Sequence, residues 1–261
     1  MTRIKAVILD WAGTTVDFGC MAPVDAFLAA FGAFGIEPTM DETRAPMGMA
    51  KRAHIKTMLD GERLAGLWRE RYGRAHTGND IDAIYAAFEP ALFATLSGHA
   101  GLLPSVLETV ERLRARGILI GSTTGYTRAM MDVVTPLAAA QGYTPDCLVC
   151  PDEVAGVGRP YPHMLWRNLE QLGIESIDAA LKVGDTLADI QEGNNAGCLS
   201  VGVIYGSSLL GLGEDDLAAL GEAERSQLYE QVSNSYFGAG ADYVIEDISQ
   251  LPQLIRALEG E

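Results

Sequence analysis

Three polar side chains in this sequence stand directly after short apolar segments. Asp10 follows the run AVIL, Thr124 ends ILIGSTT, and Asp185 follows ALKVG, with Asp189 one helical turn later. Such short apolar runs are typical of strands buried on both faces, and ligands bind at the carboxyl ends of these strands in open α/β sheets. A carboxylate nucleophile, a hydroxyl and a second carboxylate are the groups that magnesium-assisted phosphoryl chemistry requires. The sequence therefore predicts such a site at three strand ends.

The elements that must position these groups differ between the two halves of the chain. Between about residues 21 and 97 the apolar residues have helical spacing and no strand is indicated. From Pro104 onward, helical segments alternate with short apolar strands, which predicts a parallel, doubly wound sheet. We therefore expect an α/β core formed by residues 1–18 and 100–261, with a mainly helical cap inserted at residues 19–99.

The polar motifs resemble those of the haloacid dehalogenase (HAD) superfamily. Its DxxxT, hydroxyl, basic and GDxxxD motifs occur in this order as Asp10 to Thr14, Thr124, Arg159 and Asp185 to Asp189. The resemblance implies a HAD-like core with an inserted cap domain. It also implies Asp10 as the nucleophile and Mg²⁺ as the cofactor.

The lack of one carboxylate limits the reactions that we expect of this protein. HAD phosphatases and phosphomutases carry an Asp two positions after the nucleophile, where it protonates the leaving oxygen, but this chain has Ala12 there. General acid catalysis is worth ~10²–10⁴ in rate, so an enzyme acting on phosphate esters would rarely lose that group. We therefore expect a carbanion as the leaving group, which requires an electron sink such as an imine between a lysine and a substrate aldehyde.

Lys51 is the lysine best placed to form such an imine. The chain contains four lysines, which are Lys5, Lys51, Lys56 and Lys182. Lys51 follows a Pro-Met-Gly-Met loop at the start of a predicted helix. Burial against Met47 and Met49, with the positive charge of Arg52 nearby, would lower the pKa of its amine. The alternative is an ordinary solvated helix lysine.

A closer resemblance covers nearly the whole chain. The sequence is similar to the phosphonoacetaldehyde hydrolase (phosphonatase) family in the segments DWAGTTVDFGC, PMGMAK with His54, GSTTGYTR, GRPYP, KVGDT and GSSLLGLGEDD. The resemblance implies cleavage of phosphonoacetaldehyde to acetaldehyde and phosphate. Lys51 would form the Schiff base and Asp10 would attack phosphorus. Mg²⁺ would be held by Asp10, the backbone carbonyl of Ala12 and Asp185, with Asp189 supporting the metal ligands.

The same resemblance implies the other pocket residues and a homodimer formed through the caps. Thr124, Gly125 and Arg159 would hold the phosphate oxygens. The residues that would shape the pocket or aid proton transfer are Met47, His54, Cys20 and Tyr126. Simple packing remains an alternative for Met47 in its loop and for Cys20 as a small buried residue. Asp189 would also serve as a helix cap.

Composition excludes several classes of protein. The net charge of −16 over 261 residues argues against a nucleic-acid partner. No apolar run approaches the ~18 residues of a membrane span, and the amino terminus leads into a strand instead of a signal peptide, so we expect a soluble cytoplasmic protein. Four cysteines are too few and too scattered for a disulfide framework. Cys147 and Cys150 have the spacing of half a zinc site, but alternation on a buried strand is the better interpretation.

Three other functions remain open at this point. A magnesium-dependent phosphatase or phosphomutase acting on a small phosphate ester is disfavoured by Ala12. A haloacid dehalogenase also lacks that Asp but needs no metal, and it would leave the GDxxxD motif and Lys51 unexplained. A phosphate-binding regulatory module without catalysis is disfavoured by the intact set of motif residues.

Overall fold

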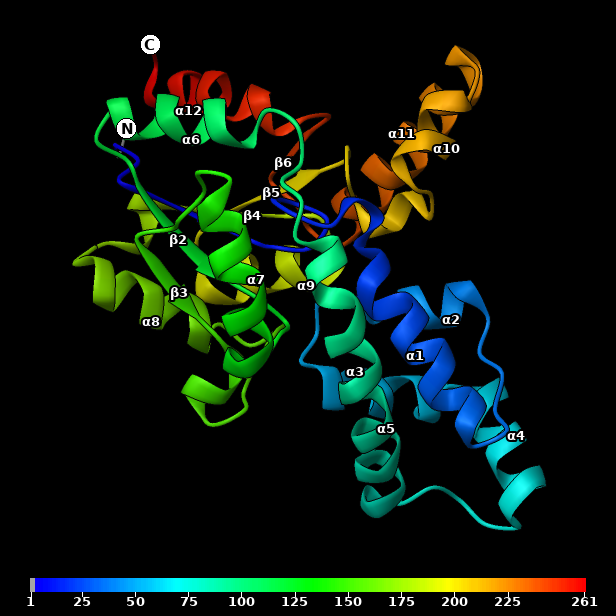
Figure 1. The fold of residues 1–261 in the computed structure, drawn as a ribbon. Coiled ribbons are helices and arrows are strands. Elements are labelled where there is room, and N and C mark those ends of the chain that lie inside the picture. Colours follow the sequence, from blue (N-terminus) through cyan, green and yellow to red (C-terminus); the bar gives the residue numbers. More distant parts are fainter. Residues whose placement is uncertain (1–2) are drawn as a thin grey trace.

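A parallel six-stranded sheet lies at the centre of the protein. The computed structural model describes residues 3–261, and its strands follow the order β3-β2-β1-β4-β5-β6 (Figure 1). The strands are β1 (Ala6–Leu9), β2 (Leu119–Thr123), β3 (Cys147–Val149), β4 (Ala180–Gly184), β5 (Leu199–Val203) and β6 (Tyr243–Ile245). Every neighbouring pair is parallel. This confirms the predicted α/β fold with a parallel sheet.

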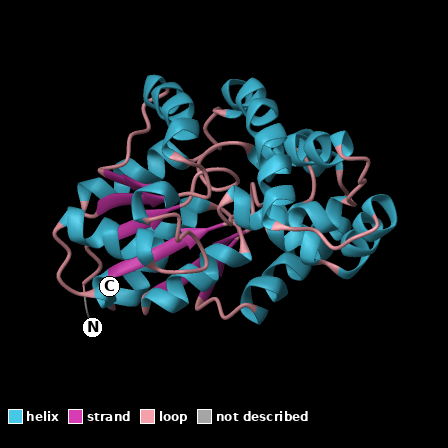
Figure 2. Ribbon diagram, turned by 90° about the horizontal axis from the view of Figure 1, so that it is seen from below, coloured by secondary structure: helices cyan, strands magenta, loops and turns pink. Residues whose placement is uncertain are grey.

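Helices cover both faces of the sheet (Figure 2). All four residues of β1 are buried. Val7 belongs to a hydrophobic cluster with side chains of α6 (Val106–Ala115) and α12 (Leu251–Glu259), whereas Ile8 packs with α8 (His163–Leu172). Because successive side chains of a strand point to opposite faces, this alternation shows that the sheet is doubly wound. The remaining helices of this part are α7 (Arg128–Ala140), α9 (Leu187–Ala196), α10 (Glu214–Ala219) and α11 (Glu222–Gly238).

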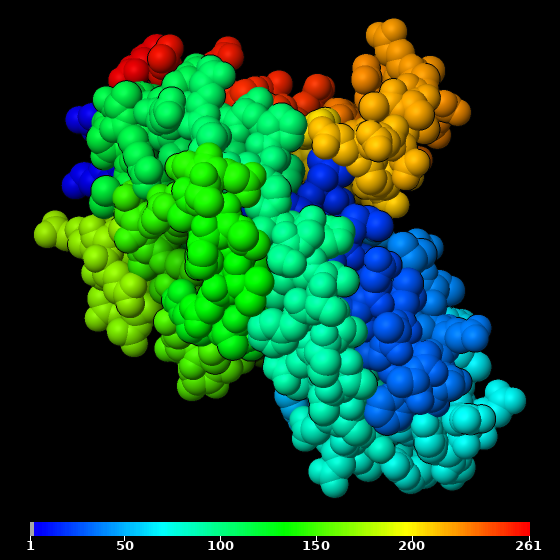
Figure 3. All heavy atoms as spheres, viewed as in Figure 1, coloured from blue at the N-terminus to red at the C-terminus, as the bar shows by residue number. Residues whose placement is uncertain are grey.

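Five helices inserted between β1 and α6 form what is called here the helical lobe. They are α1 (Met21–Ala33), α2 (Met40–Arg44), α3 (Lys51–Asp60), α4 (Glu62–Tyr72) and α5 (Gly78–Leu96). Helix α1 packs along α5, and α3 contacts both α4 and α5. Figure 3 shows the lobe in blue to blue-green, extending to one side and in direct contact with the green part of the core. We propose residues 19–99 as the extent of this cap and residues 1–18 and 100–261 as the core.

Two chain segments connect the lobe to the core, and they run side by side. Val16 forms an antiparallel bridge with Leu102. The Asp17 carboxylate accepts hydrogen bonds from the backbone N–H groups of Met21 and Ala22, and its Oδ1 lies 3.0 Å from Nδ1 of His99. These contacts hold Asp17 in the left-handed region at φ 55°, which residues other than glycine seldom adopt. None of the helices in the described range has the length and hydropathy needed to cross a membrane.

Candidate active site

The three predicted strand-end residues lie together at the carboxyl edge of the sheet. Asp10 follows β1, which lies between β2 and β4, and Thr124 and Asp185 follow those two strands. All three side chains are buried. The chain crosses from one side of β1 to the other between β3 and β4, so this edge is a topological switch point, where open α/β sheets bind ligands.

The carboxylates at this edge form a set of oxygen donors that fits a divalent metal. Asp10, Asp185 and Asp189 each offer an oxygen within 4.8 Å of the others. Burial, followed by the neighbouring carboxylates, raises the pKa of Asp185 well above its usual range. A Cβ on Gly13 would lie 2.3 Å from Asp185 Oδ2, so only glycine allows this turn to approach the carboxylate so closely. A hard cation such as Mg²⁺ would relieve the repulsion between these groups.

The contacts of Asp189 favour a supporting role over direct metal binding. Its Oδ1 lies 2.7 Å from the Lys182 ammonium and 3.0 Å from Nη1 of Arg159. Its Oδ2 accepts a 2.6 Å hydrogen bond from the Thr186 hydroxyl, which in turn caps α9. Burial works to raise the pKa of Asp189, but the two cations outweigh it and lower that pKa. Both oxygens therefore already have partners, as the predicted supporting and capping roles require.

Arg159 is buried directly beside the candidate nucleophile. Its Nη2 donates to Asp10 Oδ1 at 2.7 Å and to the Thr123 hydroxyl at 2.8 Å. Its Nε donates to Glu192 Oε2 at 3.0 Å. The neighbouring carboxylates outweigh burial and raise the pKa of Arg159, so it stays charged. This places a permanent positive charge where phosphate oxygens would lie next to Asp10.

Sequence reasoning missed the buried residues that surround Arg159. Lys182 has no solvent exposure and lies 3.1 Å from the Thr123 hydroxyl and 3.4 Å from Glu192. Two signals were available in the sequence. Lysine is rarely buried without a partner, yet Lys182 stands inside an apolar strand. Glu192 stands one helical turn after Asp189 and therefore on the same face of α9.

Lys51 is the first residue of α3, and it is only 4% exposed. Its Nζ lies 4.7 Å from the centre of the Tyr126 ring, over its face. Within residues 3–261, no hydrogen-bond or ion-pair partner is found for this ammonium. Burial is the largest cause and lowers the pKa of Lys51; nearby groups such as Asp10 oppose that shift, and the positive charge of Arg159 adds to it. A buried amine of this kind is suited to nucleophilic attack, because more of it is unprotonated near neutral pH.

The predicted contribution of Arg52 to the pKa of Lys51 is wrong. The Arg52 side chain is half-exposed and pairs with Asp82 at 2.6 Å. Successive helical residues point about 100° apart, so a buried Lys51 turns its neighbour toward solvent. The neighbouring cation is Arg159, which approaches from the core. The Met47 side chain is buried, at 2% exposed, and its part in burying Lys51 stays a prediction.

A small cavity between the helical lobe and the core brings the candidate lysine and nucleophile together. Its open volume is about 10 Å³, roughly the room that one water molecule needs, so the lining side chains nearly fill it. The lining residues are Asp10, Ala12, Cys20, Gly48, Lys51, Thr124, Gly125, Tyr126, Arg159 and Thr186. Of these, Cys20, Gly48 and Lys51 come from the lobe, so the cavity is complete only when the lobe rests on the core.

The remaining predicted pocket residues are neutral and buried. Burial raises the pKa values of the Cys20 thiol and the Tyr126 hydroxyl well above their usual range. Burial, followed by the charge of Lys51, lowers the pKa of His54 well below its ordinary value. The His54 ring lies against Phe27, and its Nε2 is 2.8 Å from the backbone carbonyl of Thr43. Neither Met47 nor His54 is among the residues that line the cavity, so their contact with substrate stays a prediction.

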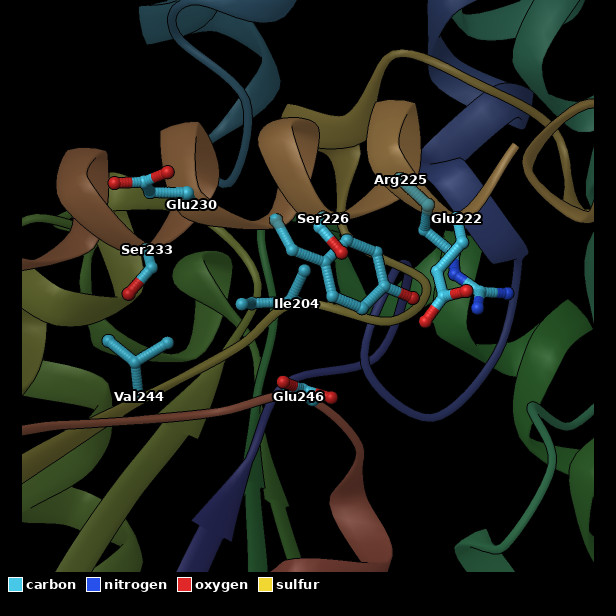
Figure 4. A pocket seen from close by; sticks show the side chains of 9 residues that line it. Ile204, Glu222, Arg225, Ser226, Glu230, Ser233, Val244 and Glu246 are labelled. Carbon is cyan, nitrogen blue, oxygen red and sulfur yellow. The ribbon is translucent and has the colours of Figure 1, made fainter. Parts of the chain in front are cut away.

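A second, more open pocket lies beside the edge strand β6 (Figure 4). Glu222, Glu230 and Glu246 line it together with one cation, Arg225. An acidic pocket repels a phosphonate or phosphate. The phosphoryl chemistry therefore belongs to the cavity at the strand ends.

Comparison with known proteins identifies the family. The family model described as haloacid dehalogenase-like hydrolase matches residues 4–197. A phosphonoacetaldehyde hydrolase of Lysinibacillus sphaericus is 46% identical over 259 residues, which cover 99% of this chain and 96% of that protein. The chain belongs to the phosphonoacetaldehyde hydrolase family of HAD-like hydrolases.

Two further relatives extend the comparison within the phosphonoacetaldehyde hydrolase family. A bifunctional phosphonoacetaldehyde hydrolase/aminoethylphosphonate transaminase of Clostridioides difficile is also 46% identical across 99% of this chain, which spans only 41% of that longer protein. The crystal structure of a phosphonoacetaldehyde hydrolase-like protein from Oleispira antarctica superposes with a TM-score of 0.94 at 38% identity. That superposition covers 100% of this chain and 96% of the other. The family assignment therefore rests on both sequence and fold.

Proposed function

We propose that this protein hydrolyses phosphonoacetaldehyde to acetaldehyde and phosphate. The names of its full-length relatives support this substrate. The observation that carries the proposal is the small cavity that holds the buried amine of Lys51, which has no ion-pair partner among residues 3–261, together with a buried carboxylate, Asp10. Ala12 lines the same cavity at the position where an ester phosphatase would carry its general acid.

The reaction begins at Lys51. Its free amine attacks the aldehyde carbon, and loss of water gives an iminium that serves as the electron sink. Lys182, the other buried lysine, lies within ion-pair distance of Asp189 and Glu192. Lys51 has no such partner in the described chain, so it is the nucleophilic lysine.

Asp10 then attacks phosphorus. The P–C bond breaks and its electron pair moves into the iminium, which becomes an enamine. Protonation of the enamine carbon and hydrolysis of the imine release acetaldehyde and Lys51. Water hydrolyses the aspartyl phosphate and restores Asp10. Thr124, Gly125 and Arg159 bind the phosphonate oxygens during these steps.

Asp10, Asp185 and the carbonyl of Ala12 would hold Mg²⁺, with Asp189 supporting them. The ion would supply charge neutralisation between the carboxylates and the anionic phosphonate. The all-oxygen donor set and the close approach of the Gly13 turn fit a hard cation.

The principal alternative is a phosphatase or phosphomutase acting on a small phosphate ester. A putative β-phosphoglucomutase from Bacteroides vulgatus has a similar fold, with a TM-score of 0.70 at 18% identity. A similarity at this level of identity concerns the fold alone. Such an enzyme needs a proton donor for the leaving oxygen, and Ala12 supplies none.

Phosphate release separates these functions. The wild-type protein should release phosphate from phosphonoacetaldehyde, lose that activity in EDTA, and regain it with added Mg²⁺. Asp10→Ala should release none. Faster hydrolysis of small phosphate esters would identify a phosphatase, and turnover that survives chelation would remove the metal-dependent mechanism. Binding of phosphate without any turnover would indicate a regulatory module.

A homodimer formed through the helical lobes and a cytoplasmic location are further parts of the proposal. The family resemblance favours the dimer. The strongly acidic composition favours a small-molecule substrate over nucleic acid. Sedimentation of the purified protein tests the dimer directly.

A further inference from the structure

Arg44, the last residue of α2, carries a buried charge that the proposed reaction does not use. Its side chain is 7% exposed, and within residues 3–261 no carboxylate lies within ion-pair distance of it. Its Nη1 donates to the backbone carbonyls of Gly19 and Ser208, both at 2.9 Å, and its Nη2 lies 3.2 Å from Met21 Sδ. Its Nε is buried with no hydrogen-bond partner in the described chain. Burying a cation without a counter-ion is costly, so these contacts call for a functional explanation.

The residue that Arg44 holds in the core also holds a candidate metal ligand. The backbone N–H of Ser208, at the start of the short turn η5 (Ser208–Leu210), donates to Asp185 Oδ2 at 2.9 Å. The adjacent Ser207 hydroxyl donates to the backbone carbonyl of Asp185 at 2.8 Å. This loop lies in the segment GSSLLGLGEDD, which the reaction steps above leave without a role.

The same arginine also contacts the connection between the lobe and the core. Gly19, whose carbonyl accepts from Arg44, donates its own N–H to the carbonyl of Gly206 at 2.8 Å. One side chain from the helical lobe therefore links the connecting segment to the loop that orients Asp185. Burial lowers the pKa of Arg44, while the nearby carboxylates of Asp17 and Asp185 oppose that shift.

We propose that Arg44 is a positioning residue that couples the placement of the helical lobe to the geometry of Asp185. When the lobe rests on the core, the guanidinium fixes the Ser208 carbonyl and brings a positive charge toward the acidic site. The Ser208 N–H then holds the carboxylate in the orientation that binds the metal. This inference rests on the metal site proposed above.

The test compares Arg44→Gln and Arg44→Lys with wild type. Mg²⁺ affinity is measured by calorimetry without substrate, and Tm, kcat and KM are measured separately. Removing a partner that orients a metal ligand typically costs 10- to 100-fold in metal affinity or activity, so we expect Arg44→Gln to bind Mg²⁺ about 10- to 100-fold more weakly. We expect kcat to fall with little change in KM, and added guanidinium to restore part of the activity. Arg44→Lys keeps the charge without the planar fork and should lose less.

A matched control is Arg63→Gln, which removes another arginine that joins two helices of the lobe. Arg63 pairs with Glu42 and donates to the backbone carbonyl of Glu37, away from the core. The Mg²⁺ affinity and the kinetics of Arg63→Gln should stay within twofold of wild type. The Lys variant keeps the test available if the Gln variant fails to fold.

The outcomes separate this inference from the proposed metal site. A lower Tm in the folded Arg44 variants with unchanged Mg²⁺ affinity and kcat would show a purely structural role and overturn the inference. A wild-type protein that binds no Mg²⁺ would overturn the metal site and this inference with it. Normal wild-type binding that the Arg44 variants retain would overturn this inference alone.

Discussion

A substitution at Gly125 tests whether the helical lobe and the core must approach each other closely. A Cβ added at this position would lie 2.6 Å from the backbone oxygen of Met49 and 2.9 Å from that of Gly48, both in the loop of the lobe that precedes Lys51. Ordinary contacts begin at 3.4 Å, so the loop must withdraw by 0.8 Å, the difference between 3.4 and 2.6 Å. Lys51 follows Met49 by two residues and would move with the loop, away from Asp10.

The expected effect on the reaction is large because it depends on alignment. A misplacement of 1 Å can cost about 100-fold, so Gly125→Ala should lower kcat/KM by roughly 30- to 100-fold, or ~2–3 kcal/mol of transition-state stabilisation. The assay is steady-state phosphate release from phosphonoacetaldehyde, with Tm measured in parallel. The matched control is Gly66→Ala in α4, where no heavy atom lies within 4 Å of the added Cβ. That control should keep wild-type kinetics and gain about 0.5–1 kcal/mol of stability. Wild-type kinetics in Gly125→Ala would refute the close approach of the two loops.

Two other predictions concern charge. Lys51→Arg keeps the cation but cannot condense with an aldehyde, so phosphonate cleavage should be abolished while Mg²⁺ and phosphate binding persist in calorimetry. Adding Ala12→Asp to this variant should not restore cleavage. Restored cleavage would contradict the role of Lys51 as the electron sink. Asp17 raises the pKa of His99 through a hydrogen bond. Because the folded pKa lies above the unfolded value of about 6.5, this stabilisation is fully present below that pH and is lost as the pH rises through the folded pKa. His99→Gln should therefore flatten the pH dependence of Tm from about pH 6.5 upward. The control His163→Gln, at an exposed position, should leave that dependence unchanged. An unaltered profile in His99→Gln would contradict the pairing of His99 with Asp17.

The sequence was sufficient to predict the central geometry of the site. Asp10, Thr124 and Asp185 follow three apolar runs, and parallel strands necessarily bring their carboxyl ends to one edge. The burial of all four residues of β1 also follows from its continuous apolar character. The burial of apolar runs and the alignment of parallel strands depend on local sequence or on regular sheet geometry. Both can therefore be predicted from a single sequence.

Contacts made by tertiary packing were beyond sequence reasoning. Arg44 and Ser208 are 164 residues apart, and no spacing rule connects them. Arg52 is adjacent to Lys51 in sequence but not in space, because successive residues of a helix point about 100° apart. The helical spacing of apolar residues between about residues 21 and 97 does not separate α3 from α4, although Gly61 adopts an extended conformation and divides them.

The central claim is that Lys51 forms an imine with the substrate, and chemical trapping tests it most directly. Borohydride added during turnover reduces an imine to a stable amine, and mass mapping of the peptides locates the adduct. We expect one substrate-dependent adduct, on the peptide that contains Lys51, and no adduct in Lys51→Arg. An adduct on Lys182, Lys56 or Lys5 instead would contradict the imine at Lys51, as would continued cleavage of the P–C bond with no adduct at all.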